Sequence, residues 1–510
     1  MHSFFYSCKC NGLSCGCYGF RLKKGCKMQF IQKIVDTVNA YMSDYVLIFL
    51  LVGAGLYFTV RTKFVQVRCF SEGMRNVFGN INLKGGKQRG GMSSFQALAT
   101  AIAAQVGTGN IVGASGAIFI GGPGAIFWMW IIAFFGMATI YAEAIMAQET
   151  RVVGDDGAVY GGPVYYIKKA FKGTFGKFLA VFFAVAATLA LGFMGAMVQS
   201  NSIAENFTGA FSDFGMDADA VKIAVGILLS AAAAFILIGG VQRLASVTEK
   251  IVPVMAVIYI VGGILIIFIN ITKIPATFGM IFKYAFTPNA MLGGAIGAAL
   301  KAAISQGAKR GLFSNEAGMG STPHAHALAN VKDSHTQGTV AMISVFIDTF
   351  IVLTVTAVVV ISSLYANGVI TPENYATVRA EGVISGSNMA QMAFSQTFSK
   401  IFGAAAGEIM GKLFVAVCLF FFAFSTIISW NYFGEVNFTY LFGKKSKIVY
   451  SVIAVAFVFL GSILSNDLVW ALTDMFNNLM VIPNVIALIA LGGSVTDVFN
   501  KRNKKMPEIK

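Results

Sequence analysis

Residues 102–116 of the chain read IAAQVGTGNIVGASG, and residues 306–323 read QGAKRGLFSNEAGMGSTP. Both stretches fall where the apolar pattern predicts a membrane-spanning helix. Their glycines and Pro323 weaken helical propagation where an ordinary span would use leucine. Two interrupted helices at corresponding positions in two halves of a chain are typical of transporters built from inverted repeats, which bind their ligands at the interruptions. The sequence therefore predicts two broken helices that form a binding site.

Long apolar runs surround both stretches. The chain has 510 residues, of which 56% are hydrophobic and 12% are charged, whereas a soluble protein usually carries about 25% charged residues. Many runs reach the roughly 20 residues that cross a bilayer, and a lipid-exposed backbone must satisfy its own hydrogen bonds as a helix. The expected spans cover about 45–61, 94–118, 124–148, 178–205, 219–239, 251–271, 291–330, 337–364, 406–436, 448–466 and 468–494. They predict an all-α polytopic membrane protein with about 11 transmembrane helices.

The order of these spans divides the chain. When the span at 45–61 is set aside, the interrupted helices are the first and the sixth of the ten that remain. Ten helices then form two five-helix inverted repeats, preceded by one extra helix. The expected segments are an unstructured N-terminal extension (1–27), the extra helix with a basic cytoplasmic connection (28–93), the first repeat (94–271), the second repeat (272–494) and a basic cytoplasmic tail (495–510).

The net charge of +15 is concentrated in the connections between spans. After the first span, one acid, Glu72, accompanies the bases Arg61, Lys63, Arg68, Arg75, Lys84, Lys87 and Arg89. The tail adds Lys501, Arg502, Lys504 and Lys505. Short connections rich in lysine and arginine stay in the cytoplasm, so we expect a cytoplasmic C-terminus and a multi-pass location in the cell inner membrane. The basic excess orients the chain in the lipid bilayer, and we expect no nucleic acid partner.

Five of the seven cysteines crowd the first 26 residues, at Cys8, Cys10, Cys15, Cys17 and Cys26. Their spacing loosely matches a metal knuckle, but Met28 begins a plausible chain of its own, so an extension from an upstream start site is the favoured interpretation. Cys69 and Cys418 imply no disulfide framework.

The first interruption offers backbone groups to a ligand. Unwinding a helix frees carbonyl oxygens that can coordinate a dehydrated sodium ion and amides that can face a carboxylate. Gly107 and Gly109 allow the backbone to approach a ligand closely, and the side chains of Thr108 and Asn110 add oxygen ligands. Close helix packing through small residues is the alternative. We expect these four residues to bind substrate.

The second interruption carries Phe313, Ser314 and Met319 around a carboxylate, Glu316. A carboxylate at membrane depth is costly and normally has a partner or a water-filled cavity. Glu316 could fix the loop through backbone amides, meet a neighbouring Lys or Arg, or attract a substrate ammonium, and the structural role ranks first. Phe313 and Met319 line a small pocket or simply pack the core.

Polar side chains in three other spans are further candidates. Ser425 and Thr426 supply hard hydroxyl oxygens, which suit alkali cations, although such hydroxyls also bond their own helix carbonyls. Trp430 lies one helical turn from Thr426 on the same face. Gln199 has a donor and an acceptor that fit a zwitterion or bond a neighbouring helix. Asp348, with Thr349 beside it, interrupts the seventh helix and is a structural candidate.

A family resemblance enters at residues 121–130, GGPGAIFWMW, which closely resemble the signature of the alanine or glycine:cation symporter family. Similar stretches are 160–167 (YGGPVYYI), 197–202 (MVQSNS) and 310–321 (RGLFSNEAGMGS). The resemblance covers Met28 to about residue 500. It implies sodium-coupled, sometimes proton-coupled, uptake of alanine or glycine across the cytoplasmic membrane of a prokaryote.

A more distant likeness to the LeuT-type transporters implies roles for single residues. It rests on Val106-Gly-Thr-Gly-Asn110, on the run from Phe313 to Gly320 and on the pair Ser425 and Thr426. Carried over, one sodium ion would lie between the carbonyls of Ala103 and Val106 and those two hydroxyls. Asn110 and Ser314 could serve a second sodium ion. The substrate would be bound by Gly107, Thr108, Gly109, Asn110, Gln199, Phe313, Met319 and Trp430.

The predicted function is sodium-coupled symport of a small neutral amino acid by alternating access, with sodium as coupling ion and no other cofactor. The alternative is a proton-coupled symporter of the same fold, with Glu316, Asp348 or Glu143 carrying the proton. An enzyme is not expected, because His324 and His326 lack a third metal ligand and no nucleophile–base pair stands out.

Overall fold

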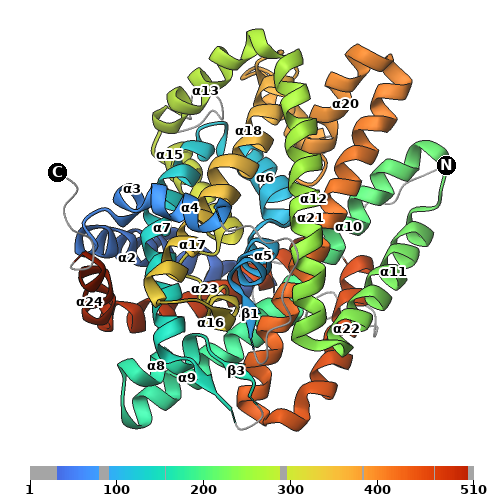
Figure 1. The fold of residues 1–510 in the computed structure, drawn as a ribbon. Coiled ribbons are helices and arrows are strands. Elements are labelled where there is room, and N and C mark those ends of the chain that lie inside the picture. The colour runs from blue at the N-terminus through green and yellow to red at the C-terminus, as the bar shows by residue number, and fades with distance from the viewer. Residues whose placement is uncertain are drawn as a thin grey trace, which may run out of the picture.

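The structure, a computed structural model, describes residues 32–79, 91–154, 157–287, 296–381, 384–464 and 466–503. Within this part the chain is nearly all helix, with strands of only two residues each (Figure 1). The predicted extension at 1–27, with its cysteines, lies outside the described residues. The all-α fold predicted from the apolar runs is confirmed.

One span precedes the two predicted repeats. It covers Gln32–Arg61 and includes η1 (Met42–Leu47) and α2 (Ile48–Arg61), and the short helices α3 (Val65–Arg68) and α4 (Phe70–Phe78) follow it. α2 packs closely on α7 (Ala125–Thr150), since Gly55 has no side chain to hold Phe135 away.

The remaining elements follow the expected order. The predicted first repeat holds α5 (Ser94–Gln105), η2 (Gly109–Gly113), α6 (Ala114–Gly121), α7, α9 (Gly173–Ala187), η3 (Thr188–Gly195), α10 (Ala196–Phe211), α11 (Ala218–Ile238) and α12 (Gly240–Ile269). The predicted second repeat holds α15 (Ile296–Asn315), α16 (Pro323–Leu328), α17 (Ser334–Val345), η6 (Phe346–Leu353), α18 (Thr354–Val360), η7 (Ile361–Tyr365), α21 (Ala404–Phe442), α22 (Lys447–Ile463) and α23 (Asn466–Ala490). Connections and ends carry α8 (Pro163–Ala170), η4 (Ser212–Phe214), η5 (Ile271–Lys273), α13 (Ile274–Phe286), α19 (Tyr375–Glu381), α20 (Met389–Phe402), η8 (Lys444–Ser446), α24 (Gly492–Asn503) and the antiparallel pair β2 (Val152–Val153) and β3 (Val159–Tyr160). The bounds of the five segments expected from the sequence, including the two repeats, stay a prediction.

A short parallel pairing shows how the two broken helices run. β1 (Met92–Ser93) directly precedes α5 and pairs with β4 (Ala329–Asn330), which directly follows α16. The start of the first broken helix and the end of the second therefore lie on one face of the molecule, so the two helices run in opposite directions. Inverted repeats require this arrangement. Figure 1 shows α5 and α6 in the middle of the bundle, where α5 packs on α12 and α21.

The number of spans differs from the expectation. Nine helices in the described part are long and apolar enough to cross a membrane, or ten if the pair Ser94–Gln105 and Gly109–Gly121, bent by 44°, is one span. The predicted count of eleven is not confirmed. The expected span at 291–330 contains α15, whose composition is less apolar because it carries Lys301, Lys309 and Arg310.

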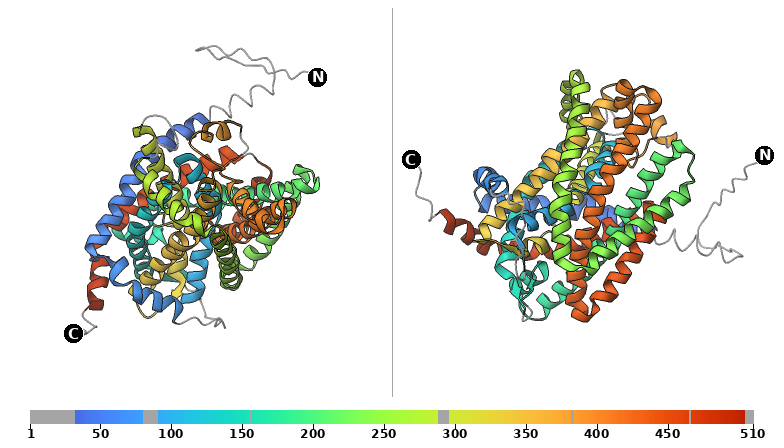
Figure 2. Two further views of the ribbon diagram at one scale, coloured as in Figure 1. Left: turned by 90° about the horizontal axis from the view of Figure 1, so that it is seen from above. Right: turned by 45° about the vertical axis from the view of Figure 1, so that its right-hand side comes forward.

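Apolar side chains cover the outside of the bundle and polar ones are buried within it. Exposed apolar residues on the peripheral helices α11, α12 and α22, which stand together in the right-hand view of Figure 2, include Phe235, Ile238, Val257, Val261, Ile448 and Val452. Asn110, Glu143, Glu316 and Asp348, in contrast, are fully buried. Apolar side chains suit a surface that faces lipid. Ionisable groups within a membrane bundle are buried where they find partners inside the protein.

Candidate functional site

The first broken helix opens between Gln105, where α5 ends, and Gly109, where the chain turns helical again. The break frees two backbone amides, and side chains satisfy both. The Gly107 amide donates to Asn110 Oδ1 at 3.0 Å, and the Thr108 amide donates to Gln199 Oε1 of α10 at 3.1 Å. A buried amide needs such a partner. Two side-chain oxygens therefore occupy the unwound turn.

Gly107 lies where no larger residue fits. A Cβ at this position would overlap Thr426 Oγ1 and come within 3.2 Å of Gln199 Oε1. Crowding of a packed site costs about 1–3 kcal/mol. We expect Gly107→Ala to reduce uptake by roughly ten- to a hundredfold, since about 1.4 kcal/mol corresponds to a factor of ten. The reduction is measured as alanine uptake per reconstituted molecule in proteoliposomes.

The matched control for this substitution is Gly53→Ala on α2. A Cβ at Gly53 meets nothing within 4 Å, so this variant should transport normally. Equal uptake by both variants would show that the space around Gly107 is unimportant.

The second broken helix opens between the end of α15 at Asn315 and Pro323. Gly318 and Gly320 adopt φ of +89° and +82°, and Glu316 adopts +58°. The left-handed region favours glycine, so this turn depends on the two glycines. Their amides both donate to the carboxylate of Glu143 on α7 at 3.0 Å. These two hydrogen bonds stabilise the unwound turn of the second break.

Helix α23 also stabilises the unwound turn of the second break. Asn484 of α23 donates to Glu143 Oε1 at 2.7 Å and to the Gly318 carbonyl at 2.9 Å. Sequence analysis ranked a structural role first for Glu316, and its contacts in the structure are structural, but they run to side chains, since Glu143 takes the backbone amides of Gly318 and Gly320. The Glu316 carboxylate accepts from the side chains of Trp430, at 2.5 Å, and Ser321. The signal for Glu143 was present, because a carboxylate in the middle of a span is costly without partners.

The Glu143 contacts lead to a prediction. Gln at this position accepts with one atom and donates with the other, so one of the two glycine amides loses its acceptor. An unsatisfied buried donor costs about 1–3 kcal/mol. We expect Glu143→Gln to lower uptake by at least about tenfold, with Glu408→Gln, an exposed carboxylate on α21, as the unaffected control. Transport by Glu143→Gln at the rate of the Glu408 variant would contradict this role.

The two breaks touch one another. Gln105 Nε2 donates to the Asn315 carbonyl at 2.8 Å, and a Cβ at Gly109 would lie 3.0 Å from the Cα of Ser314. The buried Thr108 Oγ1 and Gln105 Oε1 have no hydrogen-bond partner in the described structure. Since buried polar atoms normally have one, these oxygens are available to a ligand.

Asp348 on η6 joins both breaks. It accepts from Asn110 Nδ2 at 2.6 Å, from Ser314 Oγ at 2.9 Å and from Thr349 Oγ1 at 2.8 Å. We call these four residues the Asp348 cluster. All three side chains that donate to the carboxylate are neutral, so they do not balance its charge. A buried carboxylate without a balancing charge is costly, and a bound cation or a proton would remove that cost.

The hydroxyls of Ser425 and Thr426 contact the end of α5, just before the first break. Thr426 Oγ1 of α21 donates to the Ala103 carbonyl at 2.9 Å and is 3.3 Å from that of Ala104. Ser425 Oγ is 3.3 Å from the Ala103 carbonyl. The structure thus brings Ala103 together with both hydroxyls and adds Ala104, which sequence analysis did not name. The part of Val106 stays a prediction.

Aromatic rings border the breaks. Phe313 packs edge-on against Trp430, with ring centroids 5.5 Å apart, and lies 5.1 Å from the ring of Trp470. The Trp430 ring therefore packs against Phe313 and donates from its indole N–H to the Glu316 carboxylate. Met319 is fully buried in the second turn, where its amide donates to the Glu316 carbonyl at 3.0 Å.

One cavity lies near the first break and another near the end of α21. One, of ≈ 760 Å³, is lined by Val112 and Gly113 just beyond the first break, and by Trp470 and Asp474 of α23. The other, of ≈ 700 Å³, is lined by residues after α7 and by Tyr432 and Glu435, near the end of α21. The first cavity thus borders η2 and α15 of the broken helices, and the second borders the connection after α7 and the end of α21.

Two antiparallel broken helices at the centre of a bundle of membrane spans define a membrane transporter of the LeuT-type fold. Residues 28–509 match the sodium:alanine symporter family, and the chain belongs to that family. The resemblance carried by residues 121–130 is confirmed.

Comparisons with known proteins support both the family membership and the LeuT-type fold. The chain is 39% identical over 482 residues to the sodium/alanine symporter AgcS of Methanococcus maripaludis, covering 94% of this chain and 99% of AgcS. It is 36% identical over 480 residues to the amino-acid carrier protein AlsT of Bacillus subtilis, covering 93% of each. The crystal structure of MhsT in complex with L-phenylalanine matches the fold with a TM-score of 0.55 at 15% identity, over 81% of this chain and 99% of that one.

Proposed function

We propose that this chain is a sodium-coupled symporter that takes up a small neutral amino acid, alanine before others, by alternating access. One observation carries the proposal: the Ala103 carbonyl meets the hydroxyls of Ser425 and Thr426 beside the unwound turn at Gly107. AgcS, named a sodium/alanine symporter, and AlsT, named an amino-acid carrier, are relatives along nearly the whole chain.

The cation would bind where α5 and α21 meet. Carbonyl and hydroxyl oxygens are hard, uncharged ligands that suit an alkali ion better than a transition metal. In the structure the two hydroxyls donate to the carbonyls of α5. When a cation enters, these hydroxyls turn their hydrogens away, and all of the oxygens coordinate it. The ion then links the first broken helix to α21.

The amino acid would bind at the unwound turn. Asn110 Oδ1 and Gln199 Oε1 accept from the amides of Gly107 and Thr108, as a carboxylate would. We infer that the substrate carboxylate replaces one or both of these oxygens. Trp430 and Phe313 then limit the side chain to a small group such as a methyl, and Met319 is expected to line the same pocket.

Alternating access would use the two cavities in turn. Phe313 lies between Trp470, which lines one cavity, and Trp430, which borders the breaks. Arg310 lies over the Trp470 ring and 3.4 Å from Asp474. We infer that Phe313, Trp470 and Arg310 close the path on the outer face, with the basic connections and the C-terminus on the cytoplasmic side of the cell inner membrane. Sodium entry supplies about 2.3 kcal/mol per charge per 100 mV, so no covalent step is needed.

The Asp348 cluster favours a second candidate, proton coupling in the same fold. Its carboxylate touches both breaks, and the side chains that donate to it in the described part of the chain are neutral. Either a second sodium ion, with Asn110 and Ser314 as further ligands, or a proton would balance the charge there.

Purified protein in proteoliposomes separates the two candidates. An inward sodium gradient without a pH gradient should accumulate labelled alanine, and unlabelled glycine or serine should compete better than leucine. Accumulation driven by a pH gradient alone, without sodium, would favour the proton-coupled candidate. Accumulation of leucine but not alanine would contradict the proposed substrate class.

A further inference from the structure

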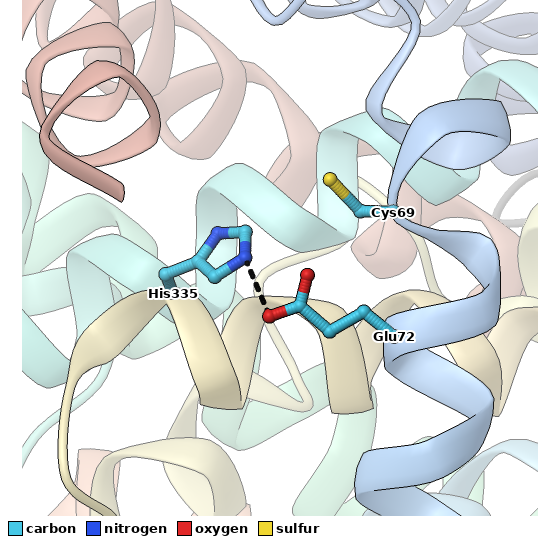
Figure 3. A group of neighbouring side chains, drawn as sticks. All are labelled: Cys69, Glu72 and His335. Atoms are coloured by element: carbon cyan, nitrogen blue, oxygen red, sulfur yellow. Dashed lines mark ion pairs between the residues drawn. The ribbon is translucent and has the colours of Figure 1, made fainter. Parts of the chain in front are cut away.

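A second group of chemically active side chains lies away from the broken helices. Cys69, between α3 and α4, Glu72 of α4 and His335 of α17 lie close together (Figure 3). One ligand atom from each lies within 4.8 Å of the other two. Figure 3 shows the His335 ring and the Glu72 carboxylate turned toward one another, with Cys69 on the same segment as Glu72. We call these three residues the Cys69 cluster.

The imidazole of His335 is held in one orientation. Its Nδ1 lies 2.6 Å from the hydroxyl of Tyr141 on α7, and its Nε2 lies 3.4 Å from Glu72 Oε1. A hydrogen-bonded partner on one ring nitrogen is the usual way in which a metal-binding histidine is oriented. His335 is 4% exposed and Cys69 is 1% exposed, so both ligands are shielded from water.

We propose that Cys69, Glu72 and His335 form a binding site for a divalent transition metal of the zinc class. Thiolate, imidazole and carboxylate are the three ligand types that zinc takes in proteins. Zinc bonds of about 2.0–2.1 Å to nitrogen and oxygen place neighbouring tetrahedral ligands roughly 3.3 Å apart. The observed 3.4 Å between His335 and Glu72 matches this spacing, and the thiol approaches by a side-chain adjustment.

An arginine of the C-terminal helix competes for the same ligands. Arg502 of α24 donates from Nη1 to Cys69 Sγ at 3.3 Å and from Nη2 to the Glu72 carboxylate. A metal ion that takes the thiolate and the carboxylate must displace the guanidinium, because both cations need the same two groups. The metal and Arg502 therefore exclude each other, and metal binding releases this contact between α24 and α4. This inference does not rest on the proposed transport function.

Cobalt(II) is the spectroscopic probe for the site. We would use the full chain in detergent with the five N-terminal cysteines replaced by serine, so that a cobalt–thiolate signal cannot come from them. Cobalt(II) should produce the charge-transfer absorption of a cobalt–thiolate bond, and zinc should abolish it. Cys69→Ser should remove the absorption, while Cys418→Ser, at a buried cysteine of α21, should leave it unchanged. Failure to see the absorption, or its survival in Cys69→Ser, would overturn the proposal.

Two further variants keep the test decisive if Cys69→Ser does not fold. His335→Gln retains the thiol and should weaken cobalt binding by at least about tenfold, the lower end of the effects seen around metal sites. Arg502→Gln removes the competing cation and should strengthen binding by a similar factor. Cobalt affinity that neither substitution changes would place the metal elsewhere and refute the site.

Discussion

Asp348→Asn is expected to lower alanine uptake by roughly a hundredfold while leaving the protein folded and inserted. The carboxylate accepts from Asn110 in the first break, Ser314 in the second break and Thr349 on its own helix. Asparagine replaces one acceptor oxygen by a donor, which faces donors, and it removes the charge that would attract a cation. An unmade buried hydrogen bond costs about 1–3 kcal/mol, and two factors of ten correspond to about 2.8 kcal/mol.

The measurement is the initial rate of labelled alanine uptake per reconstituted molecule. Asp213→Asn is the matched control, because Asp213 pairs with Lys412 at 2.8 Å near the surface. Surface ion pairs contribute about 0–1 kcal/mol, so this control should transport nearly normally. Wild-type uptake by Asp348→Asn would show that the contact between the breaks does not require a carboxylate.

Thr426→Val is expected to raise the sodium concentration for half-maximal uptake by at least about tenfold, or about 1.4 kcal/mol. Valine keeps the shape of threonine but removes the oxygen that meets the carbonyls of Ala103 and Ala104. The remaining Ser425 hydroxyl and backbone carbonyls would then hold the cation less tightly. Uptake as a function of sodium, at saturating alanine, measures the change.

Thr208→Val on α10 serves as the control for this substitution. The Thr208 hydroxyl donates to the Ala204 carbonyl of its own helix at 2.8 Å, as that of Thr426 does to Phe422 at 3.1 Å. The control therefore loses the same kind of local bond without loss of an ion ligand. Identical sodium activation in the two variants would rule out the cation assignment.

The broken helices could be predicted from sequence because their signals are local. Paired glycines at 107 and 109, and Pro323 at the start of α16, weaken helical propagation at the positions where they stand. The meeting of Ala103 with Ser425 and Thr426 followed instead from family resemblance, since no periodicity relates α5 to α21. Its geometry now adds Ala104, a backbone contribution that side-chain chemistry does not signal.

Other parts of the site depend on contacts that sequence patterns do not encode. Glu143 is 175 positions from Gly318, and Asn110 is 238 positions from Asp348. α7 is buried around much of its surface, so hydrophobic periodicity does not tell which face meets the second break. The Cys69 cluster likewise requires α4 and α17 to pack together, and none of its three residues indicates a metal site by itself in the sequence.

The most direct test is an experimental structure determined with sodium and alanine bound. We expect the alanine carboxylate at the amides of Gly107 and Thr108, and a cation among the Ala103 carbonyl and the Ser425 and Thr426 hydroxyls. Residues 106–108 and 316–322 should remain unwound around them. Alanine bound elsewhere, or continuous helix through both segments, would contradict the proposal that freed backbone groups hold ion and substrate together.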